Sequence, residues 1–308
     1  MDFGPHLMLA SLEGAVIAAI LALTAMGLSI VFGVMRVVNV AHGEFYMLGA
    51  VLAWFVASLL GGHPAYGFVA ALLIAPVLVG CLAAASDWLI LKRINYDPDR
   101  TIVGTIGMLY IIQQTTLMTF GPDARPVEAP FNTRLALPWW EWGEGGLTMI
   151  WPWGLSTTSY KLFVIVAAAT ILCALWLVIT RTKLGLLMRA TQQDSETAQA
   201  FGVPVGKVYS WVFGLGAALA AMGAVLVVPI QQAHYLMGHD PLLLSFIVVI
   251  IGGLGSLPGT VIAAILIGMS DGIISVFFSP TVAKIIATLL VAMVLVFRPQ
   301  GLMGRKAA

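Results

Sequence analysis

Nine long apolar stretches separated by short polar connections restrict what this chain can become more than any other feature. They run at about 14–34, 45–60, 65–91, 101–120, 160–179, 208–229, 242–257, 259–278 and 282–297. A helix needs about 20 apolar residues to cross a bilayer, so most of these stretches can span one, and those at 45–60 and 242–257 are near the lower limit. Charged residues make up only 9% of the 308 positions, against about 25% in soluble proteins. We therefore expect an all-α integral membrane protein, a multi-span helical bundle with eight to ten crossings.

Basic residues gather in three connections, and Lys and Arg near helix ends tend to remain cytoplasmic. The basic residues are Lys92, Arg93 and Arg100, then Arg181, Lys183, Arg189 and Lys207, and finally Arg298, Arg305 and Lys306. The 121–159 connection instead carries four acids (Asp123, Glu128, Glu141 and Glu144) and five tryptophans (Trp139, Trp140, Trp142, Trp151 and Trp153). We expect this connection outside, with its tryptophans at the lipid headgroups, the N-terminus outside and the C-terminus in the cytoplasm. Nine crossings fit this placement, and a re-entrant segment would make the count eight or ten.

The 121–159 connection divides a single membrane domain, residues 1–308, into half-repeats of about 1–120 and 160–308. In each half a hydrophobic helix leads to a broken stretch that contains glycine, at 33–50 and at 250–268. Paired interruptions of this kind point to an inverted repeat with broken or short helices and a transport pathway at the repeat interface. The likeness of the halves is positional and does not extend residue by residue.

The first break holds polar side chains between two apolar helices. Asn39, His42, Gly43 and Glu44 are candidates to line a substrate path, because ionisable groups at membrane depth usually face a protein interior or an aqueous route. The alternative is a tight cytoplasmic turn in which Arg36 pairs with Glu44 and His42 caps a helix. The sequence leaves both interpretations open.

The second break, GGLGSLPGT at 252–260, adds Gly252, Gly253 and Gly255 to the candidate path, since glycine permits positive φ angles and close backbone approach. Turn or packing chemistry would explain it equally well. Asp271, near the middle of an apolar run, is a further path candidate, or it hydrogen-bonds a neighbouring serine or backbone group. The chain has no GxxxxGK[ST] loop, so we expect it to bind no nucleotide or other cofactor itself.

A short helix is expected in the basic 181–207 segment. Asp194 suits the N-cap, Glu196 its first turn and Gly202 the C′ position. Asp194, Ala198 and Gly202 would then line one side of the helix at steps of four. A face of small residues favours the docking of another protein, and the weak apolar face argues against a helix that lies in the membrane surface.

Four stretches of this sequence are similar to one known family. They are GLSIVFGVMRVVNVAHGEFYMLGA (27–50), RATQQDSETAQAFGV (189–203), GGLGSLPGTVIAAILIG (252–268) and FRPQGLMGR (297–305). Together, in this order, they resemble the LivH-type permeases of branched-chain amino acid ABC importers. No single one of the four would be specific.

The resemblance implies a permease of the bacterial inner membrane that works with other subunits. It implies a second, LivM-like permease or a homodimer, two cytoplasmic ATP-binding subunits that hold ATP and Mg, and a periplasmic solute-binding protein. By the same resemblance, the 189–203 helix is the coupling element received by the ATPase, with Arg189, Asp194, Ala198 and Gly202 at matching positions and Glu196 beside them. Membrane lipid surrounds such a chain, and a formal net charge of +1 gives no reason to expect a nucleic-acid partner.

The leading hypothesis is therefore the permease subunit of an ATP-driven importer for small polar or zwitterionic solutes, above all branched-chain or hydrophobic amino acids. The alternative is a cation-coupled secondary transporter in which Asp271 or Glu44 binds the coupling ion. An intramembrane enzyme fits least, because the HExxH motif is absent and no Ser/His or Asp/Asp pair is recognisable at useful spacing.

Overall fold

Helices account for nearly all of the regular structure. The computed structural model describes residues 3–61, 63–143, 146–150, 156–298 and 300–303. The helices are α1 (Phe3–Met35), α2 (His42–Leu59), α3 (Pro64–Leu89), the 3-10 helix η1 (Leu91–Ile94), α4 (Pro98–Phe120), α5 (Ser159–Arg181), α6 (Lys183–Gln193), α7 (Ser195–Ala200), α8 (Val205–Val227), α9 (His239–Gly252), α10 (Leu257–Phe277) and α11 (Pro280–Phe297). Each of the nine apolar stretches falls largely within one of these helices.

Seven helices in the described part of the chain are long and apolar enough to cross a membrane: α1, α2, α3, α4, α5, α8 and α10. The other two apolar helices, α9 and α11, are shorter. Of the two segments expected to be short, 45–60 lies in the 18-residue helix α2, and 242–257 corresponds to α9, which has 14 residues and ends at Gly252. The fold is that of a multi-span helical membrane protein.

Several of these helices begin at a capping residue followed by proline. Asp97, Ser256 and Ser279 are the N-caps of α4, α10 and α11, and each side chain accepts a hydrogen bond from a backbone N–H of the first turn. Proline stands at the start of all three helices, where a missing N–H costs nothing and its fixed φ suits the helix. These local signals allow connections of only a few residues between neighbouring membrane helices.

The 121–159 connection contains short strands that the apolar pattern did not predict. β1 (Arg134–Ala136) pairs with β4 (Ser156–Thr158), and β2 (Trp139–Gly143) pairs with β3 (Gly146–Ile150), all antiparallel. Trp and Thr favour strands, and the connection is too polar to form another membrane helix. The described residues do not include Glu144, Trp151 and Trp153, nor the side chains of Trp139, Trp140 and Trp142. The predicted position of these tryptophans at the lipid headgroups therefore lies outside the described part of the chain.

α1 and α8 form the centre of the bundle. In each, 72% of the most apolar 18-residue window is buried inside the protein, compared with 22% in α4 and α5. The two central helices cross at Gly27 and Gly216, where a Cβ placed on Gly27 would lie 2.3 Å from the carbonyl oxygen of Gly216. Small residues at crossings let helix backbones approach closely, which matters in a membrane because burial from water does not hold helices together there.

The helix contacts repeat within the molecule. α1 packs against α8, α9 and α10, while α8 packs against α1, α2 and α3; α4 lies beside α2, and α11 beside α9. Exchanging α1 with α8, α2 with α9, α3 with α10 and α4 with α11 preserves these contacts. In this exchange the break after α1 corresponds to the 228–238 connection after α8. The sequence pattern had paired the break after α1 with a different segment, the break between α9 and α10.

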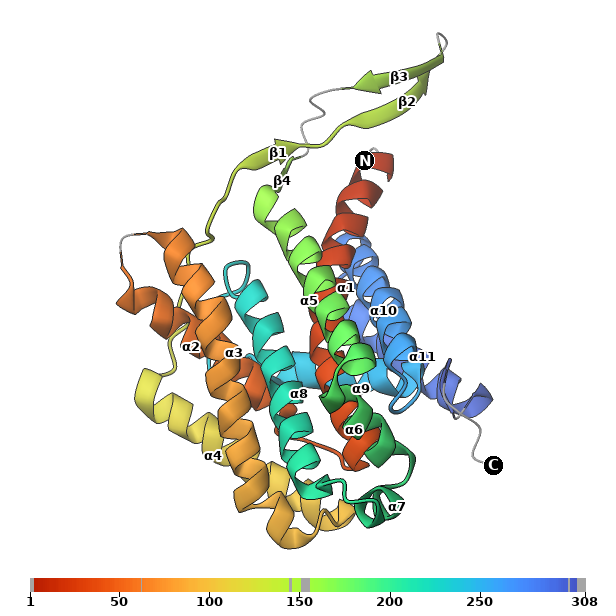
Figure 1. Ribbon diagram of the computed structural model, residues 1–308. Helices are drawn as coiled ribbons and strands as arrows, with labels where there is room; N and C mark the ends of the chain where they lie inside the picture. The colour runs from red at the N-terminus through yellow and green to blue at the C-terminus, as the bar shows by residue number, and fades with distance from the viewer. Residues whose placement is uncertain (1–2, 62, 144–145, 151–155, 299, 304–308) are drawn as a thin grey trace.

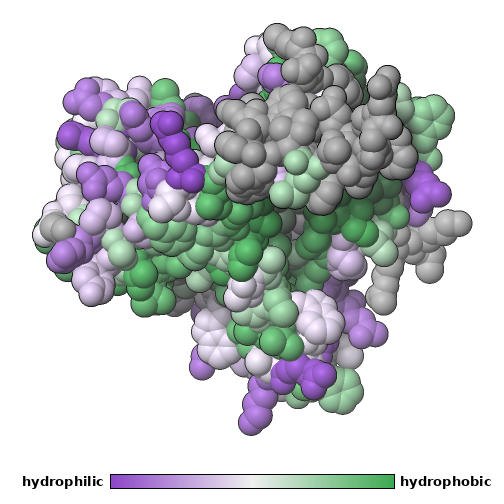
Figure 2. All heavy atoms as spheres, turned by 90° about the horizontal axis from the view of Figure 1, so that it is seen from above, coloured by the Kyte–Doolittle hydropathy of each residue, from purple (hydrophilic) through white to green (hydrophobic). Residues whose placement is uncertain are grey.

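The two ends of the bundle differ. Figure 1 shows the β2–β3 hairpin and the N-terminus at one end and the short helices α6 and α7 at the other. Viewed from the hairpin end, much of the described surface is hydrophobic (Figure 2). Apolar side chains are also exposed along α3 and α4, among them Leu73, Val103 and Met118. A water-soluble fold would not expose so many apolar side chains, but helices that face lipid do.

Candidate functional site

α2 begins beside the middle of α1 and not beside its end. α1 stops at Met35, and Arg36 has a φ of 56°, in the left-handed region, which reverses the chain. The chain then returns until His42 Nε2 lies 2.8 Å from the carbonyl oxygen of Thr24. Thr24 precedes Met35 by 11 residues, which is about 16 Å along a helix. The break therefore brings the first turn of α2 into the interior of the bundle.

The backbone of this break is held by polar side chains. Asn39 is buried, and its Oδ1 accepts a hydrogen bond from the N–H of Ala41 at 3.0 Å. The N–H of Val40 donates to Thr105 Oγ1 on α4 at 3.2 Å. These hydrogen bonds satisfy backbone N–H groups of the break, which have no partner within a helix and would be costly if buried without one. Asn39, predicted to line the path, thus has its side-chain oxygen engaged in the turn.

The N-terminal ends of α2 and α9 meet. Gly43 packs directly against Gly238, since a Cβ on Gly238 would lie 2.1 Å from the carbonyl oxygen of Gly43. Both helices carry an acid in the first turn, Glu44 in α2 and Asp240 in α9. Helix N-termini present free N–H groups and the positive end of the helix dipole, which favours these carboxylates. Two helix N-termini are thereby brought together, with Glu44 buried and Asp240 exposed.

Glu44 faces a polar side chain of α9, which in turn contacts one of α4. Its side chain is 1% exposed, and its Oε1 lies 3.7 Å from Nε2 of His239, the first residue of α9, whose side chain is 56% exposed. Nε2 of Gln113, from α4, lies 2.9 Å from the same imidazole nitrogen. Glu44 Oε2 has no hydrogen-bond partner among the described residues. We call Glu44, His239 and Gln113 the α9 cluster.

The alternative interpretation of the first break as a tight turn does not match this geometry. Glu44 faces His239, and the ion pairs among the described residues do not include one between Arg36 and Glu44. The His42 side chain does not cap α2 but binds the Thr24 carbonyl, and its Nδ1 has no partner in the described structure.

Charged side chains continue from the α9 cluster onto α10 and α11. Asp240 follows His239 and forms an ion pair with Lys284 of α11 at 2.7 Å, with both side chains exposed. Asp271 of α10 lies close enough for the charges of Lys284 and Asp240 to act on its carboxyl group. The predicted residue Glu44 thus lies beside His239 at the start of α9, and Asp271 lies within range of the charges of the next residue, Asp240, and of its partner Lys284. Within the described residues, no three His, Cys, Asp or Glu side chains are grouped as metal ligands would be.

Sequence reasoning did not single out Gln113, His239, Asp240 or Lys284 for this site. Gln113 and Lys284 did carry a signal, since each is a polar residue inside an apolar stretch. Nothing in the sequence shows, however, that α4, α9 and α11 bring them to the same place.

The predicted glycines occupy the other end of α9. Gly252 ends the helix, and Gly253 and Gly255 have φ angles of 101° and 77° in the turn to α10. Gly255 packs against Gly33 at the end of α1, where an added Cβ would lie 2.8 Å from the Gly33 Cα. This turn is about 20 Å along α9 from the α9 cluster. The predicted path residues therefore form two separate groups.

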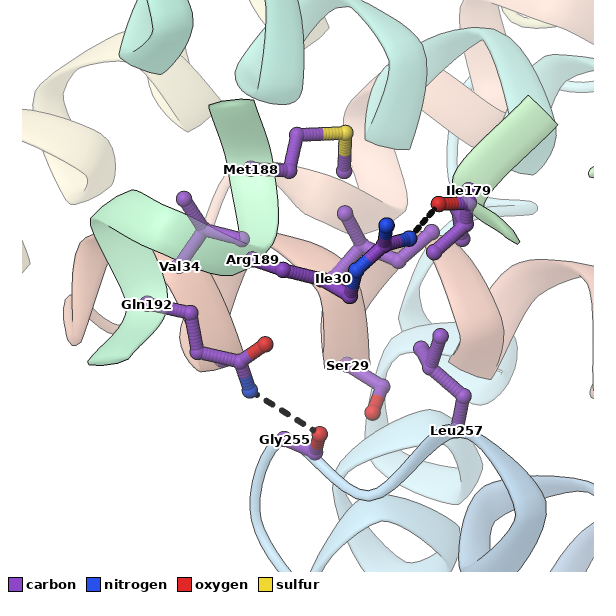
Figure 3. A pocket seen from close by; sticks show the side chains of 10 residues that line it. Ser29, Ile30, Val34, Ile179, Met188, Arg189, Gln192, Gly255 and Leu257 are labelled. Carbon is purple, nitrogen blue, oxygen red and sulfur yellow. Dashed lines mark hydrogen bonds between the residues drawn. The ribbon is translucent and has the colours of Figure 1, made fainter. Parts of the chain in front are cut away.

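A cavity of about 1020 Å³ adjoins this glycine turn, between α1, α5, α6 and residues 254–258. Arg36, Arg189, Gln192 and Ser256 are among its polar lining residues, and Trp176 is among the apolar ones. Figure 3 shows an adjoining hollow in which the Arg189 guanidinium donates to the carbonyl oxygen of Ile179 and Gln192 donates to that of Gly255. α6 is thus tied both to the end of α5 and to the α9–α10 turn.

The short helix predicted in the 181–207 segment is confirmed as α7. Asp194 is its N-cap: Oδ1 accepts from the N–H groups of Glu196 and Thr197 at 3.0 Å, and Oδ2 accepts from Thr197 Oγ1 at 2.6 Å. The hydrogen bond from the Thr197 side chain, followed by the one from its backbone, lowers the pKa of Asp194. Gly202 has a φ of 84° at C′, and the N–H of Val203 donates to the Ala198 carbonyl at 3.0 Å.

The expected face of small residues on α7 is wrong in one respect. Ala198 is only 6% exposed and packs inside the protein, so it cannot contact another protein, whereas Asp194, Glu196 and Gly202 are exposed. The exposed apolar group is Phe201, with 85% of its surface accessible. Steps of four along a helix place residues on one side but do not say which side faces the rest of the chain. Arg189 belongs to α6 and the cavity, not to α7.

Comparison with known proteins shows what the chain is similar to along its whole length. It is 26% identical to the high-affinity branched-chain amino acid transport system permease protein BraD of Pseudomonas aeruginosa, over 97% of this chain and 96% of the relative. It is 26% identical to LivH of Salmonella typhimurium, over 95% and 94%, and 22% identical to LivM of Escherichia coli, over 94% and 69%. No solved structure matches. The model of the family described as branched-chain amino acid transport system / permease component matches residues 11–297. The chain belongs to this family of permease components.

Proposed function

We propose that this chain is the membrane-spanning permease subunit of an ATP-driven ABC importer for small zwitterionic solutes, namely branched-chain or other hydrophobic amino acids. The observation that carries the proposal is α7, an exposed helix capped at both ends, with Phe201 projecting from it, in a permease without a nucleotide-binding motif. Such a chain needs a partner to supply energy, and α7 is suited to be the contact. The names of the relatives support the class of solute.

The contacts of α6 suggest how movement of α7 would reach the membrane helices. α6 is bonded to the α5 end through Arg189 and to the α9–α10 turn through Gln192, and Gly185 packs against Ile179 without room for a side chain. A partner that displaces α7 would therefore move the α9–α10 turn with it. Because α9 is a single helix, its first residues, at the α9 cluster, would move with the turn. The permease would then change between two conformations by a shift of its packed helices.

The partners and orientation are part of this proposal. Two cytoplasmic ATP-binding subunits that hold ATP and Mg would contact α7, and a periplasmic solute-binding protein would dock near the 121–159 connection. A second, LivM-like permease would complete the pathway, and similarity to both LivH and LivM supports a common fold for two such subunits. The chain would lie in a bacterial inner membrane with its N-terminus outside and its C-terminus in the cytoplasm. The repeated helix contacts support an inverted repeat of two halves, about 1–120 and 160–308.

Reconstitution tests the proposal directly. Proteoliposomes that contain this chain, its partner permease, the two ATP-binding subunits and the binding protein should take up radiolabelled leucine only when ATP is supplied. Proteoliposomes with this chain alone should take up none. Uptake by the chain alone, driven by a sodium or proton gradient, would overturn the proposal in favour of secondary transport.

A substitution tests the role of α7. Phe201→Ser should reduce co-purification of the ATP-binding subunits by about 10-fold or more, because losing a buried aromatic anchor typically costs an interface at least that factor. Phe278→Ser is the matched control: Phe278 is 76% exposed but follows α10 at the end away from the glycine turn. Equal ATPase association in both variants would refute the assignment of α7.

A further inference from the structure

The carboxylate of Glu44 is buried without a complete set of hydrogen-bond donors. Its Oε2 has no partner among the described residues, and its Oε1 lies 3.7 Å from His239 Nε2, beyond hydrogen-bond distance. A buried carboxylate that lacks donors is costly, and more so in a membrane protein. The positive end of the α2 dipole offsets part of this cost. The site is therefore short of a donor.

The side chains nearest to Glu44 do not supply that donor. Gln113 Nε2 is an amide donor placed 2.9 Å from His239 Nε2, so this imidazole nitrogen acts as the acceptor of that bond. The same nitrogen then has no proton to give to Glu44. Lys284 of α11 forms an ion pair with Asp240 at 2.7 Å. What remains is an acceptor pair that suits a cation with several N–H donors.

His239 covers the carboxylate and is held in turn by Gln113. The His239 side chain is 56% exposed while that of Glu44 is 1% exposed, so the imidazole lies between Glu44 and the surface of the subunit. A polar surface of this kind at membrane depth faces an aqueous path or another subunit and not lipid. Displacing one imidazole would open Glu44 Oε1 to that path.

We propose that Glu44 binds the ammonium group of the transported solute, with His239, held by Gln113, as the cover that the ammonium group displaces. A primary ammonium group has three N–H donors and a positive charge, which match a carboxylate whose Oε2 has no partner among the described residues. This inference rests on the proposed function and adds the part of the solute that the permease itself recognises. An inorganic cation has the same charge, and the experiment separates the two.

The experiment uses the complete importer in proteoliposomes. Glu44→Gln should lower ATP-dependent leucine uptake by about 10-fold or more, while Glu44→Asp keeps part of it, because loss of a buried charged partner costs at least this factor. Asp99→Asn, a substitution of an exposed acid in the first turn of α4, should leave uptake unchanged. If the wild-type importer shows no ATP-dependent uptake, the proposed function fails; if it does and Glu44→Gln equals it, only this inference fails.

Carboxyl labelling gives a second readout that does not depend on turnover. A water-soluble carbodiimide with an added amine should label Glu44 in the His239→Ala importer more than in the wild type, as measured by mass spectrometry. Leucine should protect Glu44 from labelling, whereas 2-hydroxy-4-methylpentanoate, which has a hydroxyl in place of the ammonium group, should not. Equal protection by the hydroxy acid, or protection by sodium ions alone, would overturn the assignment.

Discussion

Asp194 organises the start of α7 with a single side chain. Its carboxylate accepts bonds from two backbone N–H groups and from the Thr197 hydroxyl, so a helix of six residues begins at a defined position. A helix this short is not stable by itself and depends on its caps. Gly202 ends it in the left-handed conformation that a side chain would strain. The two caps together fix the position of Phe201.

The charge of Asp194 should make α7 sensitive to acid. Its pKa is lowered in the folded protein, so the carboxylate stabilises the helix above the pKa of the unfolded chain, and this contribution is lost as the pH falls through the lower, folded value. We expect amide hydrogen exchange in 195–200 to accelerate as the pH drops below about 4, after correction for intrinsic rates. Asp194→Asn keeps a capping oxygen and should remove this pH dependence. An unchanged pH profile in that variant would contradict the prediction.

Tyr160 joins α5 to α8 through one hydrogen bond. It is 2% exposed, and its hydroxyl donates to the carbonyl oxygen of Leu226 at 2.8 Å. Tyr160→Phe should lower the free energy of unfolding in detergent by about 0.5–1.5 kcal/mol, the usual contribution of one such bond. Tyr110→Phe, at a side chain that is 65% exposed, is the control and should change little. A similar loss in both variants would show that the bond does not matter.

The contact of α1 with α8 depends on glycine in both helices. Gly27 and Gly216 lie so close that a Cβ on either would overlap the other's carbonyl oxygen. Because this oxygen is backbone, it cannot move away as a flexible side chain would. The distance between the two central helices is therefore set by the absence of two side chains.

Adding a methyl group at this crossing should force the helices apart. Gly27→Ala should destabilise the protein by about 1–3 kcal/mol, the typical cost of overpacking. Gly107→Ala is the matched control, since Gly107 also lies in a helix, α4, but has no atom within 4 Å of an added Cβ. There the better helix propensity of alanine should be neutral or stabilising. Thermal unfolding of both variants in the same detergent measures the difference, and equal melting temperatures would contradict it.

The whole molecule presents different chemistry at its two ends. The 121–159 connection contains the strands, and the opposite end contains α6, α7 and the glycine turn (Figure 1). Basic residues lie in the segments around α6, which favours the cytoplasm for that end. The proposed orientation places the strands outside.

Cysteine labelling in intact cells checks this orientation. Cys81 and Cys173 are both exposed, so both are first replaced by serine. Asp123→Cys should then react with a membrane-impermeant maleimide added outside, whereas Phe201→Cys should react only after the cells are opened. Both positions are exposed, so lack of access to the side chain does not explain a negative result. Labelling of Phe201→Cys from outside would reverse the orientation.

The positions of the helices follow from local features of the sequence. Apolar length predicted the seven described helices that are long enough to cross a membrane and the two shorter apolar helices α9 and α11. Capping residues predicted α7 from Asp194 to Gly202, because capping depends on neighbours within a few residues. The 134–158 strands were missed, since short strands outside apolar stretches give a weak pattern.

Only the tertiary structure decided which residues share a site. Glu44, Gln113 and His239 come from α2, α4 and α9, and the glycine turn that seemed to belong with Glu44 lies at the other end of α9. The same holds for Ala198, whose burial depends on where α7 packs. The direction in which a helix face points depends on helices far away in the sequence, through contacts at glycine and alanine that leave no periodic signal.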